Sequence, residues 1–161
     1  MWPAIVRFDE PTMSQAVDDA LTRIVAIVGL GGIALIHILQ APEAFEEEGY
    51  LGALFVVAVV AGIGLAALLT LTADQRVLEA AGGLAGLILI GYLLSRTTGL
   101  PGATYDVGEW TEPLGLASMV VEGLVVCVAA GALATRREMT AVAVARPLAT
   151  RERRAPGATA G

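Results

Sequence analysis

Apolar residues dominate four long segments of the chain, and charged residues are confined to the stretches between and around them. About 20 mostly apolar residues in a helix are needed to cross the hydrocarbon core of a bilayer. The sequence therefore predicts four transmembrane helices, at about residues 21–40, 50–71, 77–95 and 114–134. Stretches without any Asp, Glu, Lys or Arg occupy much of each predicted helix, at residues 24–36, 50–73, 80–95 and 123–135.

A soluble bundle of four buried helices is the alternative to this prediction. A helix at the surface of a soluble protein carries a polar face, and these segments lack one. The composition agrees, since 56% of the residues are hydrophobic and 16% are charged, against roughly half and a quarter in soluble domains. We expect an all-α protein, an integral membrane bundle of four transmembrane helices.

Arginine is distributed unevenly between the two sides of this bundle. Nine of the ten basic residues lie before or at the very start of the first helix, in the short connection between the second and third helices, or after the fourth helix. Because cytoplasmic flanks are enriched in basic residues, both termini are expected in the cytoplasm. Residues 43–49 and 97–111 then form the outer loops.

The same pattern divides the chain into three parts: a cytoplasmic segment at residues 1–20, a transmembrane domain at 21–134 and a disordered Arg-rich cytoplasmic tail at 135–161. The first twenty residues contain four acidic ones, which is unlike a cleavable signal peptide. Every basic residue is arginine, which together with abundant Ala, Gly, Val and Leu suggests a GC-rich bacterial genome. We expect a multi-pass protein of the bacterial inner membrane.

Ionisable residues inside the helices are candidates for function, because a charge at the bilayer centre costs roughly 2.5–3.5 kcal/mol on insertion scales. Glu122 lies nine residues past Pro113, about 13 Å along a helix. His37, the only histidine, and Arg96 lie near the outer ends of their helices, and we expect a carboxylate beside His37. The predicted polar, ligand-binding cluster comprises His37, Arg96, Glu112, Glu122 and Met119.

A purely structural network of salt bridges between helices is the alternative interpretation of this cluster. A b-type haem with two histidine ligands is excluded by the single histidine, and neither a Glu-x-x-His pair nor a His-Glu-x-x-His motif occurs. We expect no cofactor, and the sequence leaves open whether a metal ion is bound. The one cysteine, Cys127, cannot form an internal disulfide.

Small residues recur at four-residue spacing in the third and fourth helices, at Gly82 and Gly86 and at Gly123, Cys127 and Gly131. Such spacing favours close helix packing in membranes. Expected partners are the lipid bilayer and either another membrane protein or a second copy held by helix contacts; no nucleic-acid partner is expected.

Three stretches carry a resemblance to known proteins: "APEAFEEEGYLGALFV" after His37, "LLSRTTGLPG" at the end of the third helix, and "EWTEPLGLASMVVEGL" at the start of the fourth. Together they resemble a group of small four-helix integral membrane proteins from actinobacteria and related bacteria. The resemblance implies a fold and not a function. The shared pattern includes His37, Glu43, Arg96, Pro101, Glu112, Pro113 and Glu122. These relatives often carry an acid at the position of Ser118, so the likeness implies no fixed set of metal ligands.

These observations lead to two hypotheses about function. The first is a membrane-embedded binding or accessory module whose outward polar cluster recognises an ion, a small ligand or a partner protein. The alternative is a metal- or proton-dependent membrane enzyme or transporter subunit.

Overall fold

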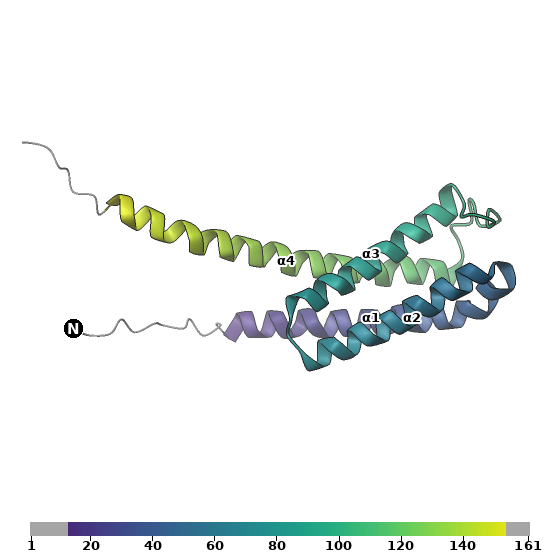
Figure 1. Cartoon of the computed structure of the whole chain (residues 1–161), viewed down its shortest axis with the longest axis horizontal. Helices are drawn as coiled ribbons and strands as arrows, with labels where there is room; N and C mark the ends of the chain where they lie inside the picture. The colour runs from purple at the N-terminus through teal and green to yellow at the C-terminus, as the bar shows by residue number, and fades with distance from the viewer. Residues whose placement is uncertain (1–12, 154–161) are drawn as a thin grey trace, which may run out of the picture.

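The computed structural model describes residues 13–153, with side chains described over residues 13–138. Within that range the chain forms four helices, α1 (Met13–Glu47), α2 (Gly49–Leu71), α3 (Gln75–Thr97) and α4 (Pro113–Arg153) (Figure 1). All four are long and apolar enough to cross a membrane. The shortest have 23 residues, or about 34 Å of helix against a hydrocarbon core of about 30 Å. The prediction of an all-α chain with four such helices is confirmed.

Two helices extend further than the apolar pattern predicts. The acidic segment expected as a loop belongs mostly to α1, and Glu48 alone separates α1 from α2. Glu48 has an extended backbone conformation, with φ −148° and ψ 114°, which turns the chain. Glutamate and alanine are good helix formers, so charge ends the apolar stretch without ending the helix.

The helix α4 likewise continues to Arg153, past the predicted start of a disordered tail at residue 135. Alanine and arginine, which favour a helix, make up nine of the 19 residues from 135 to 153. The helix α1 begins at Met13, inside the N-terminal segment expected at residues 1–20. Residues 1–12 of that segment and 154–161 of the expected tail lie outside the described residues.

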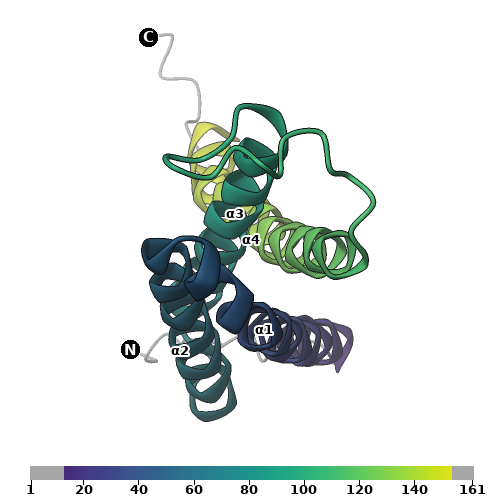
Figure 2. The ribbon, with the colours of Figure 1, turned by 90° about the vertical axis from the view of Figure 1, so that its right-hand side faces the viewer.

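The helices are arranged so that α1 packs against both α2 and α4, while α3 packs mainly against α4 (Figure 2). Their shared core contains several alanines beside larger aliphatic residues, which lets the helix axes approach closely. The buried members are Ala26, Leu30, Ile33, Leu69, Leu78, Ala81, Ala85, Val125 and Ala129.

Glycine makes the closest helix contacts, though not along the whole predicted stripe. A Cβ atom on Gly29 would lie 2.4 Å from Val125 Cγ2, and one on Gly82 would lie 2.7 Å from the Cβ of Ala129. A Cβ on Gly123 would meet no atom within 4 Å. The prediction that Gly123 lies at a helix contact is therefore wrong.

The reason is the helical phase of α4. Residues 125 and 129, which face the bundle, lie two positions after residues 123 and 127, which is about 200° around the helix. Cys127 is accordingly exposed, and a Cβ on Gly131 would also meet no atom within 4 Å. Four-residue spacing identifies a stripe of small residues but not the direction in which it points.

The two ends of the bundle differ, and we name them by what they carry. The terminal end holds the beginning of α1 and the α2–α3 connection, and the loop end holds the segment 98–112 between α3 and α4. At the terminal end Asp74 caps α3 by accepting a hydrogen bond from the backbone N–H of Arg76 at 2.9 Å.

Candidate functional site

The loop end is closed by a tight turn that depends on glycine. Gly99, Gly102 and Gly108 have φ values of 77°, 80° and 89°, in the left-handed region that only glycine enters freely. On either side of Pro101 and Gly102, Leu100 and Ala103 exchange backbone hydrogen bonds of 2.8 and 2.9 Å. The turn is therefore locally determined by sequence.

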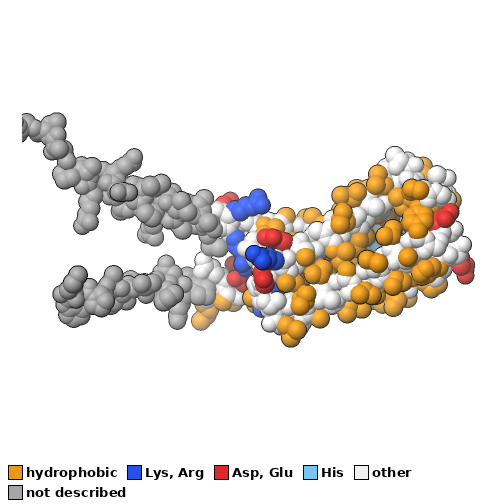
Figure 3. All heavy atoms as spheres, in the orientation of Figure 1, with side chains coloured by type: hydrophobic (Ala, Val, Ile, Leu, Met, Phe, Trp, Pro, Cys, Tyr) orange, Lys and Arg blue, Asp and Glu red, His pale blue; other side chains and the backbone are white. Residues whose placement is uncertain are grey.

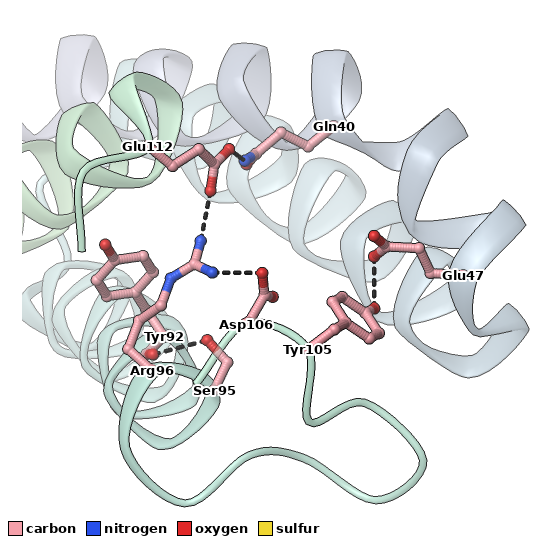
Figure 4. A network of polar contacts seen from close by, with 8 residues as sticks. All are labelled: Gln40, Glu47, Tyr92, Ser95, Arg96, Tyr105, Asp106 and Glu112. Atoms are coloured by element: carbon pink, nitrogen blue, oxygen red, sulfur yellow. Dashed lines mark hydrogen bonds and ion pairs between the residues drawn. The ribbon is translucent and has the colours of Figure 1, made fainter. Parts of the chain in front are cut away.

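Two tyrosines fasten this loop to α1 and α2. The hydroxyl of Tyr50 donates to the carbonyl oxygen of Pro101 at 2.6 Å. The hydroxyl of Tyr105 donates to a carboxylate oxygen of Glu47 at 2.5 Å (Figure 4). Desolvation raises the pKa of Tyr105 above its ordinary value, and the hydrogen bond to Glu47 and the nearby carboxylates raise this pKa further.

Arg96 ties the loop to the end of α3 and the start of α4. Its side chain is 5% exposed and forms ion pairs with Asp106, at 2.5 Å, and with Glu112. The guanidinium lies over the ring of Tyr92, 5.2 Å from its centroid. The second oxygen of Glu112 accepts a hydrogen bond from Gln40 of α1 at 3.0 Å (Figure 4). One arginine thus connects three helices and the loop.

Arg96 and its partners Asp106 and Glu112 form a polar clamp at the loop end, called the Arg96 clamp below. One cation meets two carboxylates, and both oxygens of Glu112 have donors, so the charge of Arg96 is compensated within the described residues, where its Nε alone has no acceptor. The sequence pattern predicted Arg96 and Glu112 as members of this cluster, but not Asp106 and Gln40. Gln40 had a detectable signal, since it follows His37 by three residues in a largely apolar helix; Asp106 had none, because it lies in an irregular loop.

Glu122 is different, because its carboxyl group is only half satisfied. The side chain is fully buried, with 0% exposure. One oxygen accepts a hydrogen bond from the hydroxyl of Ser118, one turn earlier, at 2.5 Å. The other, Oε2, has no hydrogen-bond partner among the described residues. No arginine or histidine of the described part forms an ion pair with it.

His37 lies inside the bundle but not beside a carboxylate partner. It is 4% exposed, its Nδ1 donates to the carbonyl oxygen of Ile33 at 2.8 Å, and its ring meets Phe55 edge-on with centroids 5.0 Å apart. No hydrogen bond or ion pair joins His37 to a carboxylate among the described residues, so the carboxylate expected beside His37 is not one of its bonding partners there. Glu112 is taken by Arg96 and Gln40, and Glu122 by Ser118 on its own helix.

Small and polar residues lie on one face of α4 between the Arg96 clamp and Glu122. Gly115 lies between Glu112 and Ser118, and a Cβ there would come within 2.8 Å of Tyr92 Cε2 and 3.2 Å of the Tyr92 hydroxyl. Glycine thus makes room for the phenol of Tyr92, whose oxygen is buried and has no hydrogen-bond partner among the described residues. Gly115, Ser118 and Glu122 are all buried and share one face of α4.

The remaining predicted residue, Met119, is half-buried beside Ser118 on α4. Metal ligation finds little support, because the described residues contain no group of three or more His, Cys, Asp or Glu side chains that could hold an ion. The five predicted residues therefore separate into the Arg96–Glu112 clamp, the Ser118–Glu122 pair and an independently bonded His37.

Comparison with protein-family models, with curated proteins and with solved structures finds no match to this chain. The function is therefore argued from the polar groups themselves, and among the carboxyl groups of the described residues Glu122 is the one that is fully buried with an oxygen left unpartnered.

Proposed function

We propose that this protein is a multi-pass membrane binding module that holds a small monovalent cation at the carboxyl group of Glu122. The observation that supports the proposal is the fully buried carboxyl group with one unpartnered oxygen. Ionisable groups at membrane depth are costly and commonly mark ion or substrate sites. An apolar side chain at this position would pack without that cost.

The donor set suits a single positive charge. Glu122 contributes a carboxyl oxygen, and Ser118 contributes a hydroxyl oxygen that already lies 2.5 Å from it. A divalent metal favours a larger set of charged or imidazole ligands, and no such group occurs in the described part of the chain. Sodium, potassium or an ammonium group fits the available oxygens best.

The ligand would reach Glu122 from the loop end. The Tyr92 hydroxyl beside Gly115 and the hydroxyl of Ser118 form successive polar steps along α4. The same row supports the alternative function, a proton-dependent transporter subunit in which Glu122 carries the proton. Proton flux into proteoliposomes that is lost on Glu122→Gln would favour that alternative over simple binding.

Thermal unfolding of the detergent-purified full chain tests the binding proposal. A ligand present at 100 times its Kd stabilises the folded state by about 2.7 kcal/mol. We expect sodium, potassium or ammonium chloride, compared at equal ionic strength with choline chloride, to raise the melting temperature of the wild type. Glu122→Gln should remove that increase, while the exposed control Glu109→Gln should retain it. Equal responses of wild type and Glu122→Gln would overturn the proposal.

We further propose that both termini lie in the cytoplasm and that the protein resides in the bacterial inner membrane, as the distribution of arginine suggests. In a variant with Cys127 replaced by alanine, an impermeant thiol reagent should label Thr104→Cys in intact cells. It should not label Gln75→Cys until the membrane is opened. The reverse pattern would invert the topology.

A further inference from the structure

We propose a second binding site, at the terminal end of the bundle, for the phosphoethanolamine headgroup of a membrane phospholipid. This site lies at the opposite end of the bundle from the Arg96 clamp and is independent of the function proposed for Glu122. It rests on a cavity, on the charges that line that cavity, and on the depth at which it lies.

The cavity has a volume of about 140 Å³ and lies where all four helices and the α2–α3 connection meet. Its charged lining residues are Asp19 and Arg23 from α1, Asp74 from the α2–α3 connection, and Arg136 from α4. Clefts for drug-sized ligands measure roughly 300–1,000 Å³. The smaller cavity suits a compact charged group.

The position of these residues in the sequence places the cavity at the membrane surface. Arg23 directly precedes the charge-free stretch 24–36, Asp74 directly follows 50–73, and Arg136 directly follows 123–135. The charged residues at the ends of these three charge-free stretches line one cavity. Its polar lining therefore lies at the interface between the apolar part of the helices and water. Phospholipid headgroups occupy that level. Charged side chains of both signs gather at this end in the space-filling view (Figure 3).

Arg23 supplies a donor that the described residues leave unused. One terminal nitrogen donates to the carbonyl oxygen of Leu69 at 2.5 Å, which fixes the guanidinium against the end of α2. Its Nε is buried and has no acceptor in the described part of the chain. A phosphate oxygen would satisfy this nitrogen, and guanidinium groups bind phosphate with strong, charge-assisted hydrogen bonds.

The balance of charge selects the kind of headgroup. Two arginines and two aspartates line the cavity, and Arg136 lies 3.4 Å from Asp19. A phosphate would lie toward the arginines and an ammonium toward the aspartates. A phosphoglycerol headgroup offers no cation to the aspartates. Basic pockets between helices at this level bind anionic lipids, so the two carboxylates distinguish this site.

The apolar surroundings suit the rest of the lipid. Ile24 and Val28, which follow Arg23 on α1 toward the bilayer centre and lie one turn apart, are exposed. Acyl chains attached to a headgroup in the cavity would run along such side chains toward the bilayer centre. A soluble phosphoethanolamine compound would gain nothing from them, which allows the source of the headgroup to be tested.

Native mass spectrometry of the detergent-solubilised full chain, titrated with lipids of identical acyl chains, tests the proposal. We expect phosphatidylethanolamine to bind about tenfold or more tightly than phosphatidylglycerol, the magnitude of one charge-assisted contact. Soluble glycerophosphoethanolamine should bind far more weakly than the lipid. Equal binding of the two lipids, or equal binding of the soluble compound and the lipid, would overturn the proposal.

Variants locate the site on the chain. Arg23→Gln should weaken phosphatidylethanolamine binding about tenfold. The matched control is Arg137→Gln, at an exposed arginine that follows Arg136 in the sequence and does not line the cavity. Because Arg23 also bonds to α2, its loss can disturb folding. Asp19→Asn, at a side chain 61% exposed, avoids that difficulty and should reduce the preference for phosphatidylethanolamine over phosphatidylglycerol. An unchanged preference in Asp19→Asn would contradict the assignment.

Discussion

Replacing Arg96 by methionine removes the charge of the loop-end clamp while keeping an unbranched side chain of similar length. The change deletes the ion pairs to Asp106 and Glu112 and the contact with the ring of Tyr92. The backbone hydrogen bond from Gly108 N–H to the carbonyl oxygen of residue 96, at 3.0 Å, can remain. We therefore expect a looser loop on an otherwise folded bundle.

The magnitude follows from how much of each partner water can reach. Breaking an ion pair with both partners buried costs about 3–5 kcal/mol. Here the carboxylates of Asp106 and Glu112 are 37% and 38% exposed, so water can hydrate them after the arginine is lost. Each pair then contributes about 0.5–1 kcal/mol, and the cation–π contact adds about 0.5–1 kcal/mol. The expected total is about 2 kcal/mol.

Reversible unfolding in mixed micelles, followed by the fluorescence of Trp110 in a Trp2→Phe background, measures this loss. Trp110 lies in the loop with its ring centroid 6.4 Å from that of Tyr92, so it reports on the clamp. Arg76→Met, at an exposed position, is the control for loss of one arginine. If the free energy of unfolding of Arg96→Met lies within 0.5 kcal/mol of the wild-type value, roughly the range of neutral surface changes, the stabilising role of the Arg96 clamp is refuted.

Two further predictions concern packing and the loop. Gly82→Ala should destabilise the bundle by about 1–3 kcal/mol, because the added methyl group would overpack against Ala129. Gly83→Ala, whose added Cβ would meet no atom within 4 Å, is the control and should be neutral or stabilising. Equal effects of the two variants in thermal unfolding would contradict the close contact. Glu47→Gln should lower the pKa of Tyr105 toward its ordinary value, measured by phenolate absorbance against Tyr105→Phe. Since the folded pKa is raised, this interaction stabilises the fold fully below about pH 10 and is lost as pH rises through the folded pKa.

The proposed cation site and the Arg96 clamp contribute to stability in opposite ways. The charges of Arg96 are paired, so its removal should weaken the fold. Glu122 leaves one buried oxygen unpaired, and an apolar replacement such as Glu122→Leu should leave stability unchanged or increase it. A residue whose removal stabilises the fold is retained for another purpose, which is the expectation for a binding site.

Several features of this protein follow from the sequence alone. Charge-free apolar stretches long enough to cross a bilayer predicted four helices, because in hydrocarbon a helix satisfies its own backbone hydrogen bonds. Gly99 and Pro101 lie just past the end of α3 and Pro113 begins α4, where glycine frees the backbone and proline restricts it. Such features depend on neighbours in sequence, so no contact between helices is needed to predict them.

Other features depend on how the helices rotate and pack against one another. The stripe of Gly123 and Cys127 pointed away from the bundle because Val125 and Ala129 face it instead. His37 bonded to Ile33 rather than to a carboxylate, and Asp106 reached Arg96 from a loop without periodicity. Membrane helices are apolar on all sides, so hydrophobicity does not determine which face turns inward. Only the packed bundle decided which polar groups found partners and left Glu122 with an oxygen that has none.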